Sequence, residues 1–339
     1  MATQQATAPA ADALVLRKRE GLWTDAFRRL IRNRGAVLGA SIILVLILVY
    51  IFADVIAVKP YDVQVNVDNN KVPQWIVSIF PMIKGYARIS TAYPLGADDL
   101  GRDLFSRIVY GTRVSLTVAF IGPLISLLIG VAYGSIAGYF GGRTDNLMMR
   151  FVDVMYAFPA LLLIILMMAF FRSSFARAAE PGTFKYMMNA LDTKFGGMLF
   201  IFIGIGITSW EGMSRLARGQ VLSLREKEFV EAARSMGANN VRIMFRHILP
   251  NILGPLIVAE TLAIPGYINY ETFLSFIGLG VNPPTPSWGA MIADGARSIR
   301  SYPHLAVFPA LALATTMFAF NFLGDGLRDA LDPRMRGTQ

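Results

Sequence analysis

The 339-residue sequence contains no cysteine, two histidines and few charged residues. The lack of cysteine excludes a disulfide framework and a cysteine-ligated metal, and His247 and His304 form no zinc-binding motif. Charged residues make up 16% of the chain, against about 25% in an average soluble domain. Hydrophobic residues make up 54% of it. This composition excludes both a disordered chain and an ordinary soluble enzyme.

Two signatures of hydrolytic enzymes are also missing. The sequence has no Gly-Lys dipeptide and therefore no P-loop, so the chain cannot hydrolyse ATP by that route. It also lacks the Gly-x-Ser-x-Gly pattern of serine hydrolases. We expect no catalytic residue, no metal and no cofactor on this chain, and an intramembrane enzyme is a weak alternative.

Long apolar runs occur instead. A membrane-spanning helix needs about 20 predominantly apolar residues. Charged residues and prolines interrupt the fourth and fifth of the runs that qualify. The six predicted spans are 36–58, 114–140, 151–171, 196–213, 252–272 and 304–324. The predicted fold is therefore an all-α polytopic membrane protein.

Basic residues indicate the orientation. The chain has 32 Lys and Arg against 23 Asp and Glu, and basic residues are concentrated before the first span. Such residues are enriched on the cytoplasmic side, so both termini are predicted to be cytoplasmic. This explanation accounts for the excess charge without nucleic acid. Residues 20–33 fit either an amphipathic helix on membrane lipid or a plain charged flank of the first span.

The spans divide the chain into predicted segments. The region 113–326 is expected to form one transmembrane domain of five helices. It includes the only sizeable cytoplasmic loop. The other predicted segments are a cytoplasmic arm at 1–35, a first transmembrane helix at 36–58, an extracytoplasmic loop at 59–112, the cytoplasmic loop at 214–251 and a cytoplasmic tail at 327–339.

The cytoplasmic loop reads as two short helices around a glycine turn. Ser223 and Glu226 fit a capping box at its start. Gly237 suits the left-handed position after a helix, and Asn239 or Asn240 can cap the next one. One apolar face of the first helix is predicted to hold Phe229, Ala233 and Met236. Pro250 is predicted to lie in the first turn of the fifth span.

This loop carries a recognisable signature. Its residues Glu231-Ala232-Ala233, Gly237 and Leu249-Pro250 resemble, at full spacing, the signature of permease subunits of binding-protein-dependent ABC importers. Stretches across about a third of the chain resemble one branch, the C-type subunit of dipeptide, oligopeptide and nickel permeases. These stretches are 93–116, 138–163, 228–251, 271–292 and 321–336. His247 stands where the general signature often has an aliphatic residue.

The resemblance implies a type I importer fold, similar to methionine permeases, in the bacterial cytoplasmic membrane. It also implies partners: a second homologous permease subunit, two ABC ATPase subunits that bind ATP and Mg, and an extracytoplasmic solute-binding protein. The residues that would couple to an ATPase are Glu231, Ala232, Ala233, Gly237, His247, Leu249 and Pro250.

The implied activity is ATP-driven import of di- or oligopeptides. The same machinery could instead carry nickel chelates or oligosaccharides, since related systems do. A stand-alone channel or secondary transporter is a further alternative, and it predicts transport without ATPase subunits.

Acidic residues in the spans are candidate pathway residues, because charge in a membrane needs a partner or water. Glu271 is predicted to line the outer part of the pathway. Glu260 could line the pore or pair across the interface. Asp153 is expected to pair with Arg150 one turn before it, and Trp288 could anchor an outer loop at the membrane interface.

Overall fold

The computed structural model describes residues 22–175, 180 and 182–331. Most of the predicted arm and the last part of the predicted tail therefore lie outside the described residues. The chain is almost entirely helical, with two short strands. Its longer helices are α1 (Leu22–Arg32), α2 (Arg34–Ile51), α5 (Leu104–Phe140), α6 (Gly142–Ala157), α7 (Ala160–Phe175), α8 (Phe184–Lys194), α9 (Leu199–Leu224), α12 (Leu249–Phe276), α13 (Trp288–Arg297) and α14 (His304–Leu331).

Four continuous helical segments are long and apolar enough to span a membrane. They are α2, α5, the continuous segment 240–276 that ends in α12, and α14. Two further spans are present if the bent pairs α6–α7 and α8–α9 each count as one, with bends of 77° and 94°. The described chain thus has four to six candidate spans, and the four continuous ones lie where the first, second, fifth and sixth apolar runs predict them.

The second span is longer than the sequence indicates. It begins at Leu104 rather than near residue 114, because Asp103 caps the helix by accepting hydrogen bonds from the backbone N and the Oγ of Ser106 at 2.8 and 2.6 Å. The preceding loop is correspondingly shorter than 59–112.

Glycines at every fourth position let α5 pack closely against α9. A Cβ at Gly134 would stand 2.0 Å from the carbonyl oxygen of Ser214. Gly130 and Gly138 make similar approaches to the same helix, with nearest atoms at 2.7 and 2.8 Å. This small-residue stripe allows the two backbones to touch, as small residues do between membrane helices.

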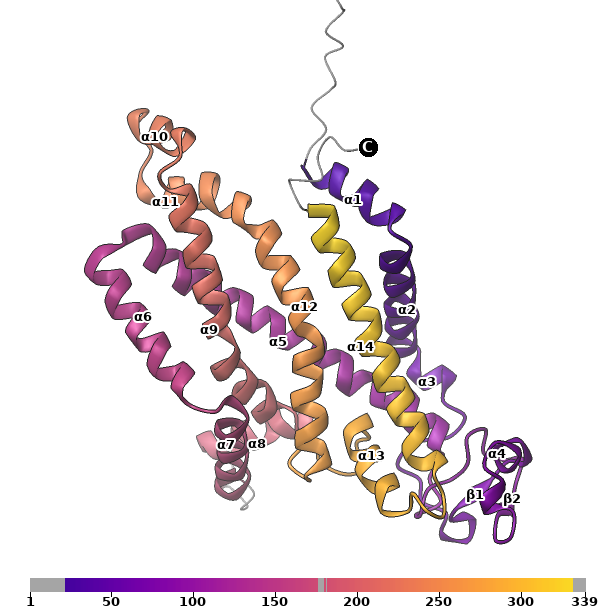
Figure 1. Ribbon diagram of the computed structural model, residues 1–339. Coiled ribbons are helices and arrows are strands. Elements are labelled where there is room, and N and C mark those ends of the chain that lie inside the picture. Colours follow the sequence, from indigo (N-terminus) through magenta and orange to yellow (C-terminus); the bar gives the residue numbers. More distant parts are fainter. Residues whose placement is uncertain (1–21, 176–179, 181, 332–339) are drawn as a thin grey trace, which may run out of the picture.

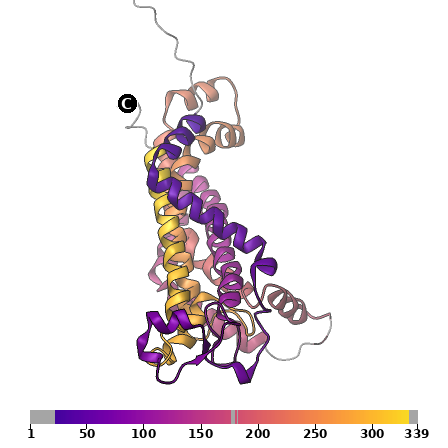
Figure 2. The ribbon, with the colours of Figure 1, turned by 90° about the vertical axis from the view of Figure 1, so that its right-hand side faces the viewer.

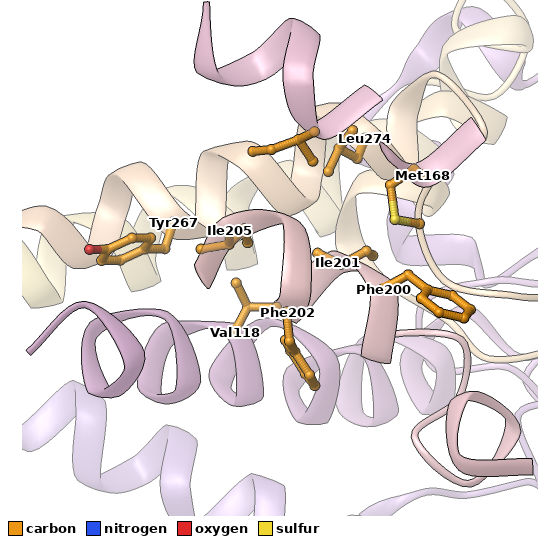
Figure 3. Close-up of a cluster of buried hydrophobic side chains, with 9 residues drawn as sticks. Val118, Met168, Phe200, Ile201, Phe202, Ile205, Tyr267 and Leu274 are labelled. Atoms are coloured by element: carbon orange, nitrogen blue, oxygen red, sulfur yellow. The ribbon is translucent and has the colours of Figure 1, made fainter. Parts of the chain in front are cut away.

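A buried apolar cluster joins the helices of the bundle (Figure 3). Its nine residues come from four helices, so the core ties α5, α7, α9 and α12 together. They are Val118, Ile164, Met168, Phe200, Ile201, Phe202, Ile205, Tyr267 and Leu274.

The elements separate to two ends of the molecule (Figure 1). One end holds α1, the last turn of α14 and the short helices α10 (Glu228–Ser235) and α11 (Asn240–Ile243). The opposite end holds α13, α4 (Gln74–Ile79) and the parallel strands β1 (Lys71–Val72) and β2 (Arg88–Ile89). Figure 2 shows α2 running obliquely across α14 between these ends.

The segment between α2 and α5 folds into a small compact unit at one end of the bundle, referred to below as the cap. It contains the four-residue helix α3 (Ala53–Ile56), the 3₁₀ turns η1 (Asn66–Asp68) and η2 (Pro81–Ile83), and the elements β1, α4 and β2. Four of its apolar side chains form a buried cluster of their own: Val72, Ile76, Val77 and Ile83. The apolar stretch 72–83 therefore supplies the core of this cap.

Expectations for two residues outside the cytoplasmic loop are wrong. Trp288 does not anchor a loop at an interface: it is fully buried, and its indole N–H donates to the carbonyl of Ile108 at 3.0 Å. Asp153 pairs with Arg215 of α9 at 2.8 Å, not with Arg150 of its own helix. In both cases a tertiary neighbour replaces the local partner.

The amphipathic pattern of 20–33 forms α1. Arg29 and Asp25 pair one turn apart at 2.9 Å, and Ala26 is buried. Phe27 and Ile31 remain 63% and 57% exposed. These exposed apolar side chains fit a helix that lies on a membrane surface.

Candidate functional site

The loop between α9 and α12 is a compact helical hairpin. After α10, Gly237 takes a φ of +83°, in the left-handed region that favours glycine. Asn239 then caps α11 by accepting a hydrogen bond from the N–H of Arg242 at 2.8 Å. A π-helical turn, η3 (Met244–Ile248), leads into α12, whose first turn contains Pro250. The glycine turn, the Asn239 cap and the Pro250 position are as predicted.

The predicted capping box is wrong. Ser223 lies in the last turn of α9, which continues to Leu224. The residue before α10 is Lys227, and it makes no side-chain capping bond. Because α9 continues through Ser223, this residue does not cap α10.

The predicted apolar face is also rearranged. Val230 and Ala233 are the buried residues of α10, packed in one cluster with Ile243 and Ile248 against α9 and α12. Phe229, expected to share that face with Ala233, is 40% exposed. Ala233 therefore fits the chain's own bundle, so enlarging its side chain would disturb this hairpin directly.

The outward side of the hairpin carries large apolar residues. Met236 is 80% exposed, Val241 and Phe245 are each 65% exposed, and Phe229 of the same loop is half-exposed. Glu231 and Ala232 are exposed as well. The short helices α10 and α11 of this loop lie at one end of the molecule, beyond the bundle (Figure 1).

The remaining signature residues lie at the junction with α12. His247 and Leu249 are partly buried, and Pro250 is exposed. Leu249 packs against the same buried cluster as Val230. The carbonyl of His247 accepts a hydrogen bond from the side chain of Asn251 at 2.6 Å. These residues fix the direction in which the chain leaves the hairpin.

The end of α5 supports the hairpin at two points. The guanidinium of Arg225 donates to the carbonyl of Gly138 at 3.0 Å, and the hydroxyl of Tyr139 donates to the side chain of Asn240 at 2.9 Å. These two contacts hold both sides of the hairpin to α5.

The helix α6 is also tied to α9. Arg218 of α9 binds Asp145 of α6 through two hydrogen bonds, at 2.5 and 2.6 Å. Such bidentate pairs fix the relative orientation of the two side chains in addition to pairing their charges. The hairpin is therefore bonded to α5, and α6 is bonded to α9.

Both predicted pathway carboxylates lie inside the bundle. Glu260, 5% exposed, accepts hydrogen bonds from the hydroxyls of Ser126 and Tyr267 at 2.5 and 3.0 Å. Glu271 has no exposed surface and accepts from Ser275 at 2.6 Å. Glu271 is thus buried within the described chain, and its place along the pathway stays a prediction.

A cavity of about 590 Å³ opens in the side of the bundle. Its walls are the break between α6 and α7, the middle of α9 and the middle of α12. Glu211 is the one carboxylate among the lining residues. The sequence carried a signal for this site, since Glu211 interrupts an apolar run, but it did not show which neighbours the residue meets. The lining residues are Tyr156, Phe158, Pro159, Ala160, Thr208, Ser209, Glu211, Gly212, Leu262, Ala263, Gly266, Tyr267 and Tyr270.

Comparison with known proteins identifies the family. Residues 130–337 match the family described as binding-protein-dependent transport system inner membrane component. The chain belongs to this family. Residues 21–73 match the N-terminal transmembrane domain of oligopeptide transport permease C. This permease is thus a pore-forming component of the bacterial inner membrane, as the hairpin signature predicts.

Named relatives are similar over most of the chain. An oligopeptide transport system permease protein of Haemophilus influenzae is 42% identical over 93% of this chain and 89% of its own. The corresponding Bacillus subtilis protein is 39% identical, over 98% and 97%. A dipeptide transport system permease protein of Bacillus subtilis is also 39% identical, over 92% and 86%.

A solved structure confirms the fold. The inward-facing MetNI methionine ABC transporter contains a chain that aligns with a TM-score of 0.50 at 16% identity. The alignment covers 67% of this permease and 96% of that chain. The permease therefore has the helical fold expected from the sequence.

Proposed function

We propose that this permease is one of two pore-forming subunits of an ATP-driven importer of di- or oligopeptides. Its relatives are named as oligopeptide and dipeptide transport permeases. A second homologous permease would complete the pore, and an extracytoplasmic binding protein would deliver the peptide. Two ABC ATPase subunits would bind ATP and Mg, because this sequence has no P-loop.

The proposed topology has six spans with both termini in the cytoplasm. In support, α1, the end of α14 and the hairpin lie at the same end of the molecule (Figure 1). The basic residues before the first span favour the cytoplasm for that end. The proposed segments are an arm (1–35), a first span (36–58), an outer loop that ends at Asp103, where α5 begins, a five-helix domain that runs from there to 326, and a tail (327–339).

The observation that carries the coupling proposal is the exposed apolar side of the hairpin. A small loop cannot bury Met236 and Phe245 itself, and burial of each in a partner contributes about 1.5–3 kcal/mol. We infer that this side docks into an ATPase subunit. Glu231, Ala232 and Gly237 would lie at the contact, while Ala233, His247, Leu249 and Pro250 would hold the hairpin in position.

The contacts of the hairpin explain how ATP could drive the pore. When ATP closes the two ATPases, the docked hairpins would move with them. The bonds from Arg225 and Asn240 to α5, and the Arg218–Asp145 pair, would carry that movement into the helices of the bundle. The bundle helices would then rotate as a unit, because the glycine stripe holds α5 and α9 together.

The test compares Met236→Asp and Phe245→Asp with the control Met236→Leu in proteoliposomes that contain all subunits. We expect the Asp variants to remain in the membrane with the second permease but to lose ATPase subunits and peptide uptake. Loss of one apolar contact should weaken association at least about tenfold. Met236→Leu keeps the apolar surface and should behave like wild type. Wild-type uptake in both Asp variants would contradict the proposal.

The same preparation tests the alternative of a stand-alone channel or secondary transporter. Vesicles that contain the two permeases without ATPase subunits should show no concentrative peptide uptake. Uptake at the rate of the full complex would refute the ATP-driven mechanism.

A further inference from the structure

The cavity in the side of the bundle lies where the helix between α6 and α7 is broken. Pro159 causes the break, because the residue before a proline avoids the helical region. Phe158 accordingly has an extended backbone, with φ −83° and ψ 132°. Non-helical backbone at membrane depth is tolerated where it is buried in protein or lines a water-filled cavity. Here it lines the cavity.

Glu211 is the charged group of this cavity. It is 8% exposed, and within the described chain its carboxylate forms no ion pair or side-chain hydrogen bond. Arg215 lies one turn further along α9, but its guanidinium is bound to Asp153 at 2.8 Å and lies over the ring of Tyr156 at 4.4 Å. The nearest helical cation is thus already engaged.

The two other buried glutamates of the described chain, Glu260 and Glu271, make a useful contrast. Glu260 accepts hydrogen bonds from Ser126 and Tyr267, and Glu271 accepts one from Ser275. A buried carboxylate without such partners is costly. Glu211 alone of the three faces the cavity without a donor, so a positively charged ligand would supply the missing partner.

The rest of the cavity suits the same ligand. Tyr267, Tyr270 and Phe158 line it with aromatic rings, which attract cations over their faces. Its volume of about 590 Å³ lies within the range of small-molecule sites, roughly 300–1,000 Å³. A short peptide fits such a space, and its amino terminus is an ammonium group.

We propose that Glu211 binds the terminal ammonium group of the peptide as it passes through this cavity, with Tyr267 and Tyr270 beside it. This inference rests on the proposed peptide importer and adds the residue that holds the substrate in the membrane. Thr208 and Ser209 offer hydroxyl groups in the same wall for the peptide backbone.

The first experiment measures uptake of trialanine by the complete complex with its binding protein in proteoliposomes. Glu211→Gln removes the charge and keeps the shape. It should lower uptake about ten- to hundredfold at limiting peptide, the effect expected for one charge-assisted hydrogen bond. Glu211→Asp should retain part of the activity. The control Asp329→Asn removes an exposed charge at the far end of α14 and should match wild type.

The outcomes separate this inference from the function on which it rests. If the wild-type complex does not import trialanine, both fail. If wild type and Glu211→Gln import it equally well, the importer stands and the role of Glu211 is refuted.

The second experiment needs no variant, so it holds even if Glu211→Gln does not assemble. A membrane-permeant carbodiimide is applied to the wild-type complex, and modified carboxyls are located by mass spectrometry. Trialanine should protect Glu211, whereas N-acetyltrialanine, which lacks the ammonium, should not. Protection by N-acetyl-Ala-Lys-Ala would extend the site to side-chain ammonium groups. Equal labelling of Glu211 with all three peptides would overturn the proposal.

Discussion

The substitution Gly134→Ala tests the contact that joins the hairpin to the pore. The added Cβ would stand 2.0 Å from the carbonyl oxygen of Ser214 and 3.0 Å from the Cβ of Ala217. The closest atom belongs to a helix backbone, which cannot turn away as a flexible side chain can. Restoring an ordinary contact of 3.4 Å requires α5 and α9 to separate by roughly 1.4 Å at this point.

The expected magnitude follows from this separation. Overpacking a tight interface costs about 1–3 kcal/mol, and the higher helix propensity of alanine offsets up to about 1 kcal/mol of it. We expect Gly134→Ala to be the most destabilising of the three glycine-to-alanine substitutions in the stripe. A Cβ added at Gly130 or Gly138 would have its nearest atom further away, at 2.7 or 2.8 Å. Gly219→Ala on α9 is the matched control, since no atom lies within 4 Å of its added Cβ.

Thermal unfolding of the purified complex in detergent is monitored by size-exclusion chromatography after heating. Peptide uptake is measured separately in proteoliposomes. Gly134→Ala should lower the apparent melting temperature by roughly 2 °C for each kcal/mol of net cost, and Gly219→Ala should leave it unchanged or raise it. Uptake should fall with Gly134→Ala, since the same two helices receive the movement of the hairpin. Equal stability of the two variants would refute the close-packing argument.

Three further outcomes follow from single contacts. Gly237→Ala should cost about 1 kcal/mol or more because of the left-handed backbone, and ATPase activity should become less responsive to peptide while the complex still assembles. Asp153→Asn should free Arg215 to pair with Glu211, so uptake should fall in the wild-type background but not further in Glu211→Gln, as a double-mutant cycle would show. Asp103→Ala should destabilise the start of α5 by about 1 kcal/mol in thermal unfolding, whereas Asp103→Asn should retain most of the cap.

The sequence predicted the features that depend on near neighbours along the chain. Apolar runs located the spans because a membrane requires about 20 such residues in succession. The turn at Gly237 and the cap at Asn239 were predictable because each is a local backbone requirement. The fourfold spacing of Gly130, Gly134 and Gly138 is likewise a local pattern, and it favours close helix packing without naming the partner helix.

Only the tertiary structure decided which residues meet across the bundle. Helical periodicity places residues on one face, but it does not say whether that face meets another helix, a partner or lipid. Ala233 and Trp288 are buried in the chain itself, and Asp153 binds a helix 62 residues away in sequence. Glu211 became a candidate site because the break at Pro159 opens a cavity beside it, whereas Glu271 is buried and lies outside that cavity.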